Sequence, residues 1–379
     1  MTVINVLTPG FNSSNGSAFL FPLIVHRNTL ISASLEVRLV DRTTAGITDC
    51  DVLAIDSKEF REDWATEESR TLDLLYSFAD SGAKIAWFDT TDGTGTLQSQ
   101  VLPIVDRYLK SQLLSDKARY TQRIYGGRVH SEFYNRTVGV VDIEDAIDEP
   151  ITLEDTAKLD VSWNSGLADY STFGPKWIGL YRRTRISRLL RYPKPSQDAR
   201  SDRSNDLSAR FGATYSKATV RYQREKIRQL LAARLDTCKL NRRGYMNELK
   251  QSDVVLSPFG WGEITLKDFE VFLTGGALLK PSMGHMQTWP NFYESNVTYL
   301  PHEWDLSDLE DAINWAIENE SQRRDIAVEG QRRYAEHTSG AHAAEIFADH
   351  LNLIIADVRA TPLSPAVELS TKPQAQSKQ

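Results

Sequence analysis

The sequence has very little cysteine and no long apolar run. Its 379 residues include only 2 cysteines, Cys50 and Cys238, which excludes a disulfide framework and a cysteine-based zinc site. The longest apolar stretches, Ala18–Val25 and Leu351–Ala356, are far shorter than the ~20 residues that a membrane-spanning helix needs. The first residues also lack the basic region and apolar core of a signal peptide. We therefore expect a cytoplasmic protein.

A basic excess and a dinucleotide fingerprint are also missing. With 51 acidic and 44 basic side chains the net charge is −7, which argues against a dedicated nucleic-acid-binding protein. Gly10 and Gly16, which follow the first apolar run, do not have the G-x-G-x-x-G spacing of a dinucleotide site. The composition, 41% hydrophobic and 25% charged, is that of a soluble enzyme of about two domains.

What the sequence does contain is an alternation of short apolar runs with segments long enough to hold a helix. Strands alternating with helices indicate a parallel sheet covered on both faces, so we expect an α/β protein with two Rossmann-like domains facing a cleft. A capping-box pattern at Ser307 and Glu310 predicts a helix start. The expected strands are Val3–Leu7, Leu35–Val40, Val52–Ile55, Ile85–Phe88, Val101–Val105, Trp177–Tyr181, Ala209–Tyr215, Val254–Leu256 and Ala277–Leu279.

The organisation along the chain follows from the same pattern. We expect an N-terminal domain over residues 1–170, a C-terminal domain over 171–340, and a helix over 341–359 that crosses back to the first domain. The acidic run from Asp142 to Glu149 is expected to be a solvated connection. Residues 360–379, rich in Thr, Pro, Ser, Gln and Lys, are expected to be a disordered tail.

The most informative segment runs from Ser257 to Glu270. It follows an expected strand and leads into a helix, which is where open α/β sheets bind ligands. Gly260 and Gly262 allow close approach of the backbone, and a helix N-terminus favours an anionic group. At 100° per residue, Glu263, Lys267 and Glu270 lie within about 60° of one another. Lys267 would then neutralise a phosphate, and Glu270 would accept hydrogen bonds from sugar hydroxyls; a surface helix with supporting ion pairs is the alternative.

The run from Ser257 to Pro281, followed by His285 and Trp289-Pro290, resembles the C-terminal domain of exostosin-like and related family-1-type GT-B glycosyltransferases. The resemblance implies that Glu270 holds the ribose of a nucleotide-sugar donor, that Lys267 lies near the donor phosphates, and that His285 contacts the donor. Glu263 and Glu270 have six residues between them, whereas many retaining GT-B enzymes have seven. The resemblance therefore leaves the catalytic role of Glu263 and the stereochemistry open.

A basic cluster lies between Tyr181 and Lys194, a stretch without acidic residues. The resemblance suggests that Arg182 and Arg185 meet the donor diphosphate, and arginine pairs bidentately with phosphate. A second interpretation is peripheral contact of residues 182–194 with the inner face of a membrane that carries a lipid-linked acceptor. A third is a solvated basic helix face.

The N-terminal domain would supply the acceptor side. Phe11 and Asn12, in the loop after the first strand, are the candidate acceptor-binding residues, and Asp89 and Asp92 are the candidate catalytic bases. For Asp89 and Asp92 the alternative is an Asp-rich turn that only caps the strand. Asp49-Cys50-Asp51 matches an Asp-x-Asp metal motif, but it belongs to the other large glycosyltransferase fold, and we expect no metal site.

The sequence thus predicts a metal-independent glycosyltransferase, a hexosyl- or pentosyltransferase, without a cofactor. It would move a sugar from a nucleoside-diphosphate sugar to a glycan or lipid-linked acceptor in bacterial surface polysaccharide or glycoconjugate synthesis, and would bind no nucleic acid. The alternatives are a catalytically silent scaffold of the same fold and a Rossmann-type NAD(P) oxidoreductase.

Overall fold

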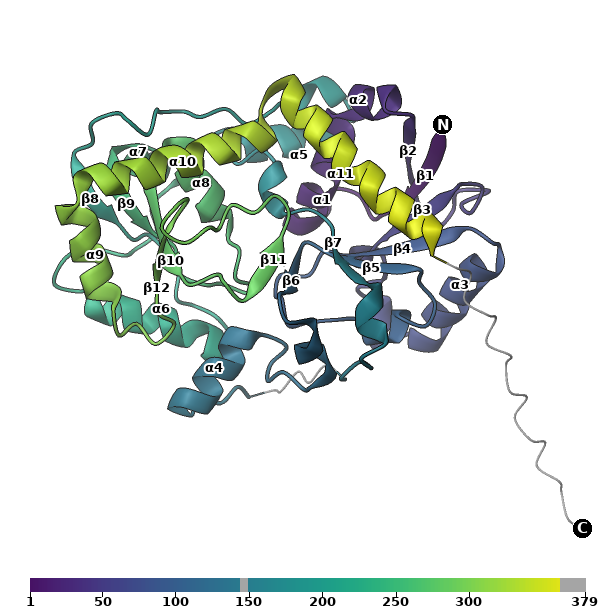
Figure 1. Cartoon of the computed structure of the whole chain (residues 1–379), viewed down its shortest axis with the longest axis horizontal. Helices are drawn as coiled ribbons and strands as arrows, with labels where there is room; N and C mark the ends of the chain where they lie inside the picture. The colour runs from purple at the N-terminus through teal and green to yellow at the C-terminus, as the bar shows by residue number, and fades with distance from the viewer. Residues whose placement is uncertain (144–148, 362–379) are drawn as a thin grey trace, which may run out of the picture.

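The computed structural model describes residues 1–143 and 149–361. The middle of the acidic run and all of the expected tail beyond residue 361 lie outside the described residues. Two parallel sheets form the centres of the two halves of the molecule (Figure 1). They are the two Rossmann-like domains that the alternation of strands and helices predicts, and the arrangement is that of the GT-B fold.

The N-terminal sheet has 6 parallel strands in the order β2-β1-β3-β4-β5-β7. Its inner strands are apolar runs that are buried on both faces, as expected for a parallel sheet with helical cover. Its strands are β1 Thr2–Leu7, β2 Leu35–Val40, β3 Val52–Asp56, β4 Lys84–Asp89, β5 Arg107–Lys110 and β7 Leu159–Val161. The helices of this half are α1 Ser14–Val25, α2 Arg27–Ser32, α3 Glu68–Asp80 and α4 Val129–Val138.

The C-terminal sheet has 4 parallel strands in the order β12-β10-β9-β8. A 2-stranded antiparallel sheet joins the halves, because β11 of the second half pairs with β6 of the first. The remaining strands are β6 Gln112–Leu114, β8 Asn205–Ser208, β9 Ser252–Leu256, β10 Ala277–Pro281, β11 Met286–Thr288 and β12 Leu300–His302. The remaining helices are α5 Gly174–Thr184, α6 Ala218–Leu230, α7 Arg242–Gln251, α8 Leu266–Thr274, α9 Leu309–Glu318, α10 Glu320–Thr338 and α11 Gly340–Ala360.

Three of the expected strands are wrong. Val101–Val105 is a short 3₁₀ turn and a loop, since Pro103 cannot donate to a ladder, and β5 follows it. Trp177–Tyr181 lies in helix α5, where Gly174, Ile178 and Tyr181 have helical spacing toward the interior. Ala209–Tyr215 is a loop after β8 whose alternating burial imitates a strand.

The capping box was expected at the wrong helix. The residue before α9 is Asp308, whose side chain caps nothing there, so Ser307 and Glu310 do not form the pair. A capping box is present instead at α8, between Thr265 and Asp268. The Asp268 carboxylate accepts a hydrogen bond from the Thr265 backbone N–H at 3.0 Å, which fixes the start of α8 at the edge of the second sheet.

Helix α11 returns from the C-terminal half to the N-terminal sheet (Figure 1). It packs on α2, β3 and β4, and its Asp357 forms a bidentate ion pair with Arg107 of β5, with Nη2–Oδ1 at 2.9 Å. The Phe347 ring of α11 meets the Trp163 ring edge-on, with centroids 5.3 Å apart. One apolar core therefore continues through both halves.

The packing of α11 gives a prediction about stability. Phe347→Ala removes a side chain that is only 1% exposed and leaves a cavity beside Trp163, so we expect the free energy of unfolding to fall by about 3–5 kcal/mol. Leu353→Ala on the same helix, at a position that is 71% exposed, should change it by less than about 0.5 kcal/mol. Urea unfolding measures both values. Equal effects of the two variants would contradict the packing role of α11.

Candidate functional site

A cleft between the two sheets is the main concavity near the strand ends. It has two adjoining lobes of about 1150 and 880 Å³, which share Ser14, Ala18 and Leu266. The carboxyl ends of β4 and β9 lead into loops that line the first lobe. Such an edge is where parallel sheets bind ligands.

The first lobe combines apolar side chains with hydroxyl, amide and charged groups. From the N-terminal half come the start of α1 and the loop after β4, and from the C-terminal half the loop between β9 and α8. The N-termini of α1 and α8 both lie at this lobe, and helix N-termini favour anions. Its polar lining residues are Ser14, Asn15, Thr90, Thr91, Asp92, Ser111, Gln112, Ser162, Ser165, Tyr215, Arg224 and Thr265.

The second lobe combines charged and apolar groups. Arg182 of α5, Arg242 at the start of α7 and Glu270 of α8 line it. Arg242 pairs with the Glu270 carboxylate, and its second nitrogen donates to the carbonyl oxygen of Tyr170 at 2.8 Å. The pair therefore presents a carboxylate and a guanidinium side by side on one wall.

Several of the predicted site residues come together in this cleft. Asp92, Gly260 and Gly262 line the first lobe, and Phe11, Asn12, Arg182 and Glu270 line the second. Arg185 is not a lining residue of either lobe. It ends α5 in a left-handed conformation with φ of 56°, and its guanidinium lies near Gly10.

Gly262 is required by an approach between the two halves. A Cβ at this position would lie 1.8 Å from the carbonyl oxygen of Asp92, so any other residue would force the two loops apart. The sequence pattern had suggested an approach to a ligand. Gln112 donates to the same carbonyl oxygen, and the Asp92 loop is thus held from both sides.

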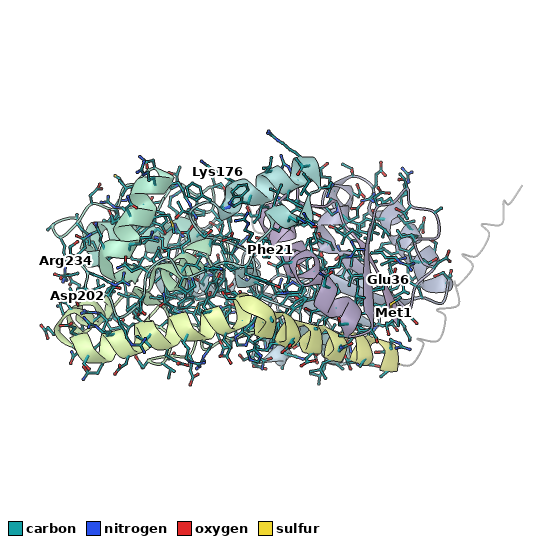
Figure 2. All side chains as sticks on the ribbon, turned by 90° about the horizontal axis from the view of Figure 1, so that it is seen from above. Met1, Phe21, Glu36, Lys176, Asp202 and Arg234 are labelled. Carbon is teal, nitrogen blue, oxygen red and sulfur yellow. The ribbon has the colours of Figure 1, made fainter. Side chains whose placement is uncertain are left out.

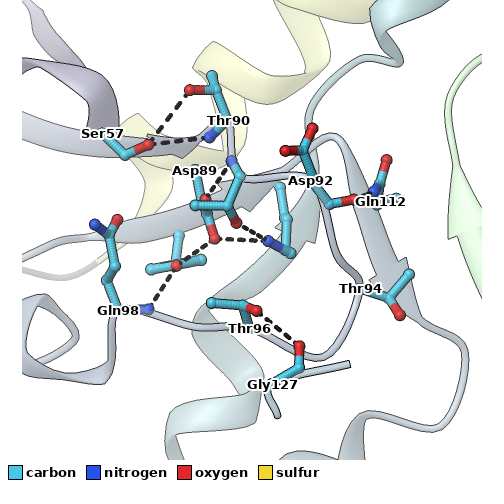
Figure 3. A network of polar contacts seen from close by, with 12 residues as sticks. Ser57, Asp89, Thr90, Asp92, Thr94, Thr96, Gln98, Gln112 and Gly127 are labelled. Atoms are coloured by element: carbon cyan, nitrogen blue, oxygen red, sulfur yellow. Dashed lines mark hydrogen bonds and ion pairs between the residues drawn. The ribbon is translucent and has the colours of Figure 1, made fainter. Parts of the chain in front are cut away.

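Asp89 does not serve as a base in the cleft. Its carboxylate is 1% exposed and accepts hydrogen bonds from Lys110 Nζ at 2.8 Å, Tyr108 Oη at 2.7 Å and the Thr91 N–H at 2.8 Å (Figure 3). Burial alone would raise the pKa of Asp89, but the Lys110 ammonium and these hydrogen bonds lower it below its ordinary value. This group holds the end of β4 to β5, so its assignment as a catalytic base is wrong.

Asp92 is the carboxylate of that loop that reaches the cleft. It is exposed, lines the first lobe, and lies beyond the Asp89 network (Figure 3). Its Oδ1 accepts a hydrogen bond from Asn15 Nδ2 at 2.7 Å, which fixes the carboxylate beside the N-terminus of α1.

Glu263 is buried away from both lobes. It is 0% exposed and accepts hydrogen bonds from the N–H and Oγ1 of Thr94 at 3.1 and 2.7 Å. His130 and His285 lie 3.8 and 3.7 Å from its Oε1. Burial alone would raise the pKa of Glu263, but the two imidazoles hold it well below its ordinary value. Its catalytic assignment is therefore wrong, because it binds the two halves together.

His285 and Lys267 were also misplaced. His285 faces Glu263 and a separate side cavity with Phe133 and Trp304. Lys267 Nζ turns inward to the carbonyl oxygens of Arg210 and Leu256, and burial lowers its pKa to about 7. Since neither side chain lines the cleft, their assignments to the donor are wrong.

The sequence pattern does not reveal two further functional candidates, Arg242 and Arg224. Nothing in the sequence distinguishes Arg242 from the arginines of the surface. Only the packing of α7 beside α8 brings it to Glu270. Arg224 is buried below the first lobe, where its guanidinium lies 4.9 Å from the Tyr215 ring centroid and Nη1 donates to the Gly212 carbonyl oxygen at 2.8 Å. Because both residues are far from the Gly260 loop in the sequence, no local pattern connects them with it.

Residues 1–143 and 149–361 contain neither a candidate metal site nor a helix suited to span a membrane. In that part of the chain, no group of three or more His, Cys, Asp or Glu residues is arranged to hold a metal ion. Nor does any described helix have the length and apolar character needed to cross a bilayer.

Comparison with known proteins gives similarity at the level of fold. No protein-family model and no curated protein matches the sequence. Among solved structures, HepE of Anabaena in complex with UDP-glucose is similar over 94% of this chain and 100% of that chain, with 10% identity and a TM-score of 0.41.

Two further solved structures show similarity of the same order. T4 phage β-glucosyltransferase matches over 93% of this chain and 99% of that chain, with 10% identity and a TM-score of 0.44. The S. aureus MnaA–UDP structure matches over 96% and 99%, with 10% identity and a TM-score of 0.38.

The buried Glu263 group predicts a pH-dependent stability difference. Glu263→Gln removes the charge that accepts the hydrogen bonds of Thr94, so we expect the free energy of unfolding at pH 7 to fall by about 1.5–3 kcal/mol. Because the folded pKa of Glu263 is lowered, its contribution is present above the unfolded value near 4.5 and is lost as the pH falls through the folded value.

The difference between wild type and Glu263→Gln should therefore shrink in acid. Denaturant unfolding from neutral to acidic pH measures it, with Glu62→Gln at an exposed position as the control. A difference that stays constant down to the lowest accessible pH would show that the charge of Glu263 contributes nothing.

Proposed function

We propose that this protein is a glycosyltransferase that takes a sugar from a nucleoside-diphosphate sugar and passes it to a glycan or lipid-linked acceptor. The observation that carries the proposal is the cleft itself. Helix N-termini from both halves meet at Ser14 and Leu266, where the two lobes join, and Glu270 and Arg242 lie in one lobe with Asp92 in the other.

The donor would span the junction of the lobes. Glu270 would accept hydrogen bonds from the ribose hydroxyls in the second lobe. The diphosphate would lie at the N-termini of α1 and α8, whose dipoles favour the negative charge that develops on the leaving group. Arg182, at the edge of the second lobe, would add a bidentate partner for a phosphate. Together these groups would neutralise the negative charge of the leaving diphosphate.

The sugar and the acceptor would then occupy the first lobe. Its hydroxyl and amide lining suits sugar hydroxyls, and Asp92 is the carboxylate available to take a proton from an attacking hydroxyl. Phe11 packs edge-on against Tyr181 with ring centroids 4.9 Å apart, in the lobe of Glu270. In this arrangement Phe11 and Asn12 border the nucleoside, on the donor side of the cleft.

A role in bacterial surface polysaccharide or glycoconjugate synthesis belongs to the same proposal. It is supported by the first lobe, which is open to solvent and leaves room for an acceptor to extend out of the cleft. The NAD(P) oxidoreductase is disfavoured, because the loop after β1 has no glycine fingerprint.

The nucleotide assignment is tested on Glu270. Glu270→Gln should weaken binding of the preferred nucleoside diphosphate about tenfold or more, since hydrogen bonds to a charged group contribute about 1.5–3 kcal/mol. Isothermal titration with UDP, GDP, CDP and dTDP gives the preferred nucleotide and the affinities. Glu310→Gln, at an exposed position on α9, is the matched control. Unchanged affinity in a Glu270→Gln variant that melts normally would refute the assignment, and no binding of any nucleotide would favour the silent scaffold.

The base assignment is tested on Asp92. Asp92→Asn should lower kcat by about 10²–10⁴ while leaving nucleoside-diphosphate affinity within about twofold, because the residue does not line the lobe that would hold the nucleoside. Asp73→Asn, at an exposed position on α3, is the control. Transfer is measured with the nucleotide sugar selected by titration, or by its slow hydrolysis. A normal kcat in Asp92→Asn would remove this residue from the mechanism.

A further inference from the structure

The outer face of α5 and the segment after it expose unusually many apolar side chains. Phe173, Trp177, Leu180 and Ile186 are 58%, 36%, 40% and 53% exposed. They fall within one stretch of fourteen residues, and Val138, Val141 and Ile143 form a second exposed apolar group. Such a patch marks an interaction surface.

All charged side chains of the same stretch are basic. No acidic residue lies between Asp169 and Asp198. Within residues 1–143 and 149–361, no acidic side chain forms an ion pair with any of the cations of this stretch. These cations are Lys176, Arg182, Arg183, Arg185, Arg188, Arg191 and Lys194.

Two of the cations lie directly beside apolar groups of this stretch, whereas Arg182 lines the second lobe. Arg191 lies 5.7 Å from the Trp177 ring centroid, and Lys176 lies 5.7 Å from that of Phe173. The side of α5 that carries Gly174 and Tyr181 is buried, and Tyr181 packs against Phe11. Helix α5 therefore lies flat on the body with its basic and apolar side outward, and Figure 2 shows Lys176 at the edge of the molecule away from α10 and α11.

We propose that this surface, residues 173–194, docks on an anionic lipid bilayer. An amphipathic helix that lies flat, with apolar side chains among cations, has the chemistry of an interfacial membrane helix. Each basic side chain near an anionic leaflet is attracted to it, and Trp177 is of the type that prefers the headgroup region. A nucleic acid would use the cations but leaves Leu180 and Ile186 without partners, so it is disfavoured.

Docking would bring the bilayer close to the cleft, because α5 also lines the second lobe. Pro175, Gly179 and Arg182 of α5 line the second lobe, so a bilayer against the outer face of α5 lies beside the mouth of the cleft. A substrate with a lipid tail would reach the cleft without leaving the membrane. The docking itself does not depend on the proposed function, because it requires no donor or acceptor.

Vesicle sedimentation with the full chain tests the proposal. The protein should sediment with vesicles of mixed phosphatidylglycerol and phosphatidylcholine, and much less with phosphatidylcholine alone. Arg183→Glu combined with Arg188→Glu should weaken binding at least about tenfold, since each basic group contributes a factor of about five. Neither residue lines the cleft, so nucleotide affinity should be unchanged.

A second double charge reversal, far from this surface, serves as the control. Lys226→Glu with Arg234→Glu makes the same charge change on exposed residues, and Figure 2 shows Arg234 at the far end of the molecule; this variant should bind vesicles like wild type. Trp177→Ala with Leu180→Ala should reduce the binding that survives high salt. Equal loss in both charge variants, no preference for the anionic vesicles, or binding to duplex DNA but not to vesicles would each overturn the proposal.

Discussion

The cleft depends on the packing of Trp163 between α1 and the returning helix α11. Its ring stacks on Phe19 of α1 with centroids 5.0 Å apart and meets Phe347 of α11 edge-on. Its indole N–H donates to the Phe19 carbonyl oxygen at 3.1 Å, so the buried polar atom is satisfied. Because Trp163 also lines the first lobe, the contact that joins α1 and α11 forms part of the cleft wall.

Buried charges hold the loops that surround the cleft. Asp89 pairs with Lys110, and Asp268 pairs with Lys280 at 3.2 Å, with all four side chains 0% exposed. Asp268 also accepts from Ser257 Oγ at 2.6 Å and Tyr293 Oη at 2.9 Å. Replacing one partner of such a pair leaves an uncompensated charge in a dry interior, which is strongly destabilising. These groups therefore keep the strand ends in place, and the chemistry is left to polar groups that remain open to the cleft.

The distribution of charge connects the cleft with the outer face of α5. A net charge of −7 hides a stretch without acidic residues that runs along one edge of the molecule. One side of α5 contributes Arg182 to the second lobe and the other side carries unpaired cations. A single helix thus joins a site suited to a diphosphate with a surface suited to anionic headgroups, since both partners are attracted by the same excess of guanidinium groups.

The sequence by itself determined the α/β class, the apolar strands β1, β3, β4, β9 and β10, and the place of the segment from Ser257 to Glu270 between a strand and a helix at the cleft. Apolar runs and turn residues are local signals, and they report local structure well. Helical angles placed Glu263, Lys267 and Glu270 near one another, but angle cannot say what packs against a face. Only the tertiary structure buried Glu263 on Thr94, turned Lys267 toward Arg210, and brought Arg242 to Glu270. The function of a charged side chain is decided by desolvation and by partners distant in sequence, and both exist only after the two halves have packed together.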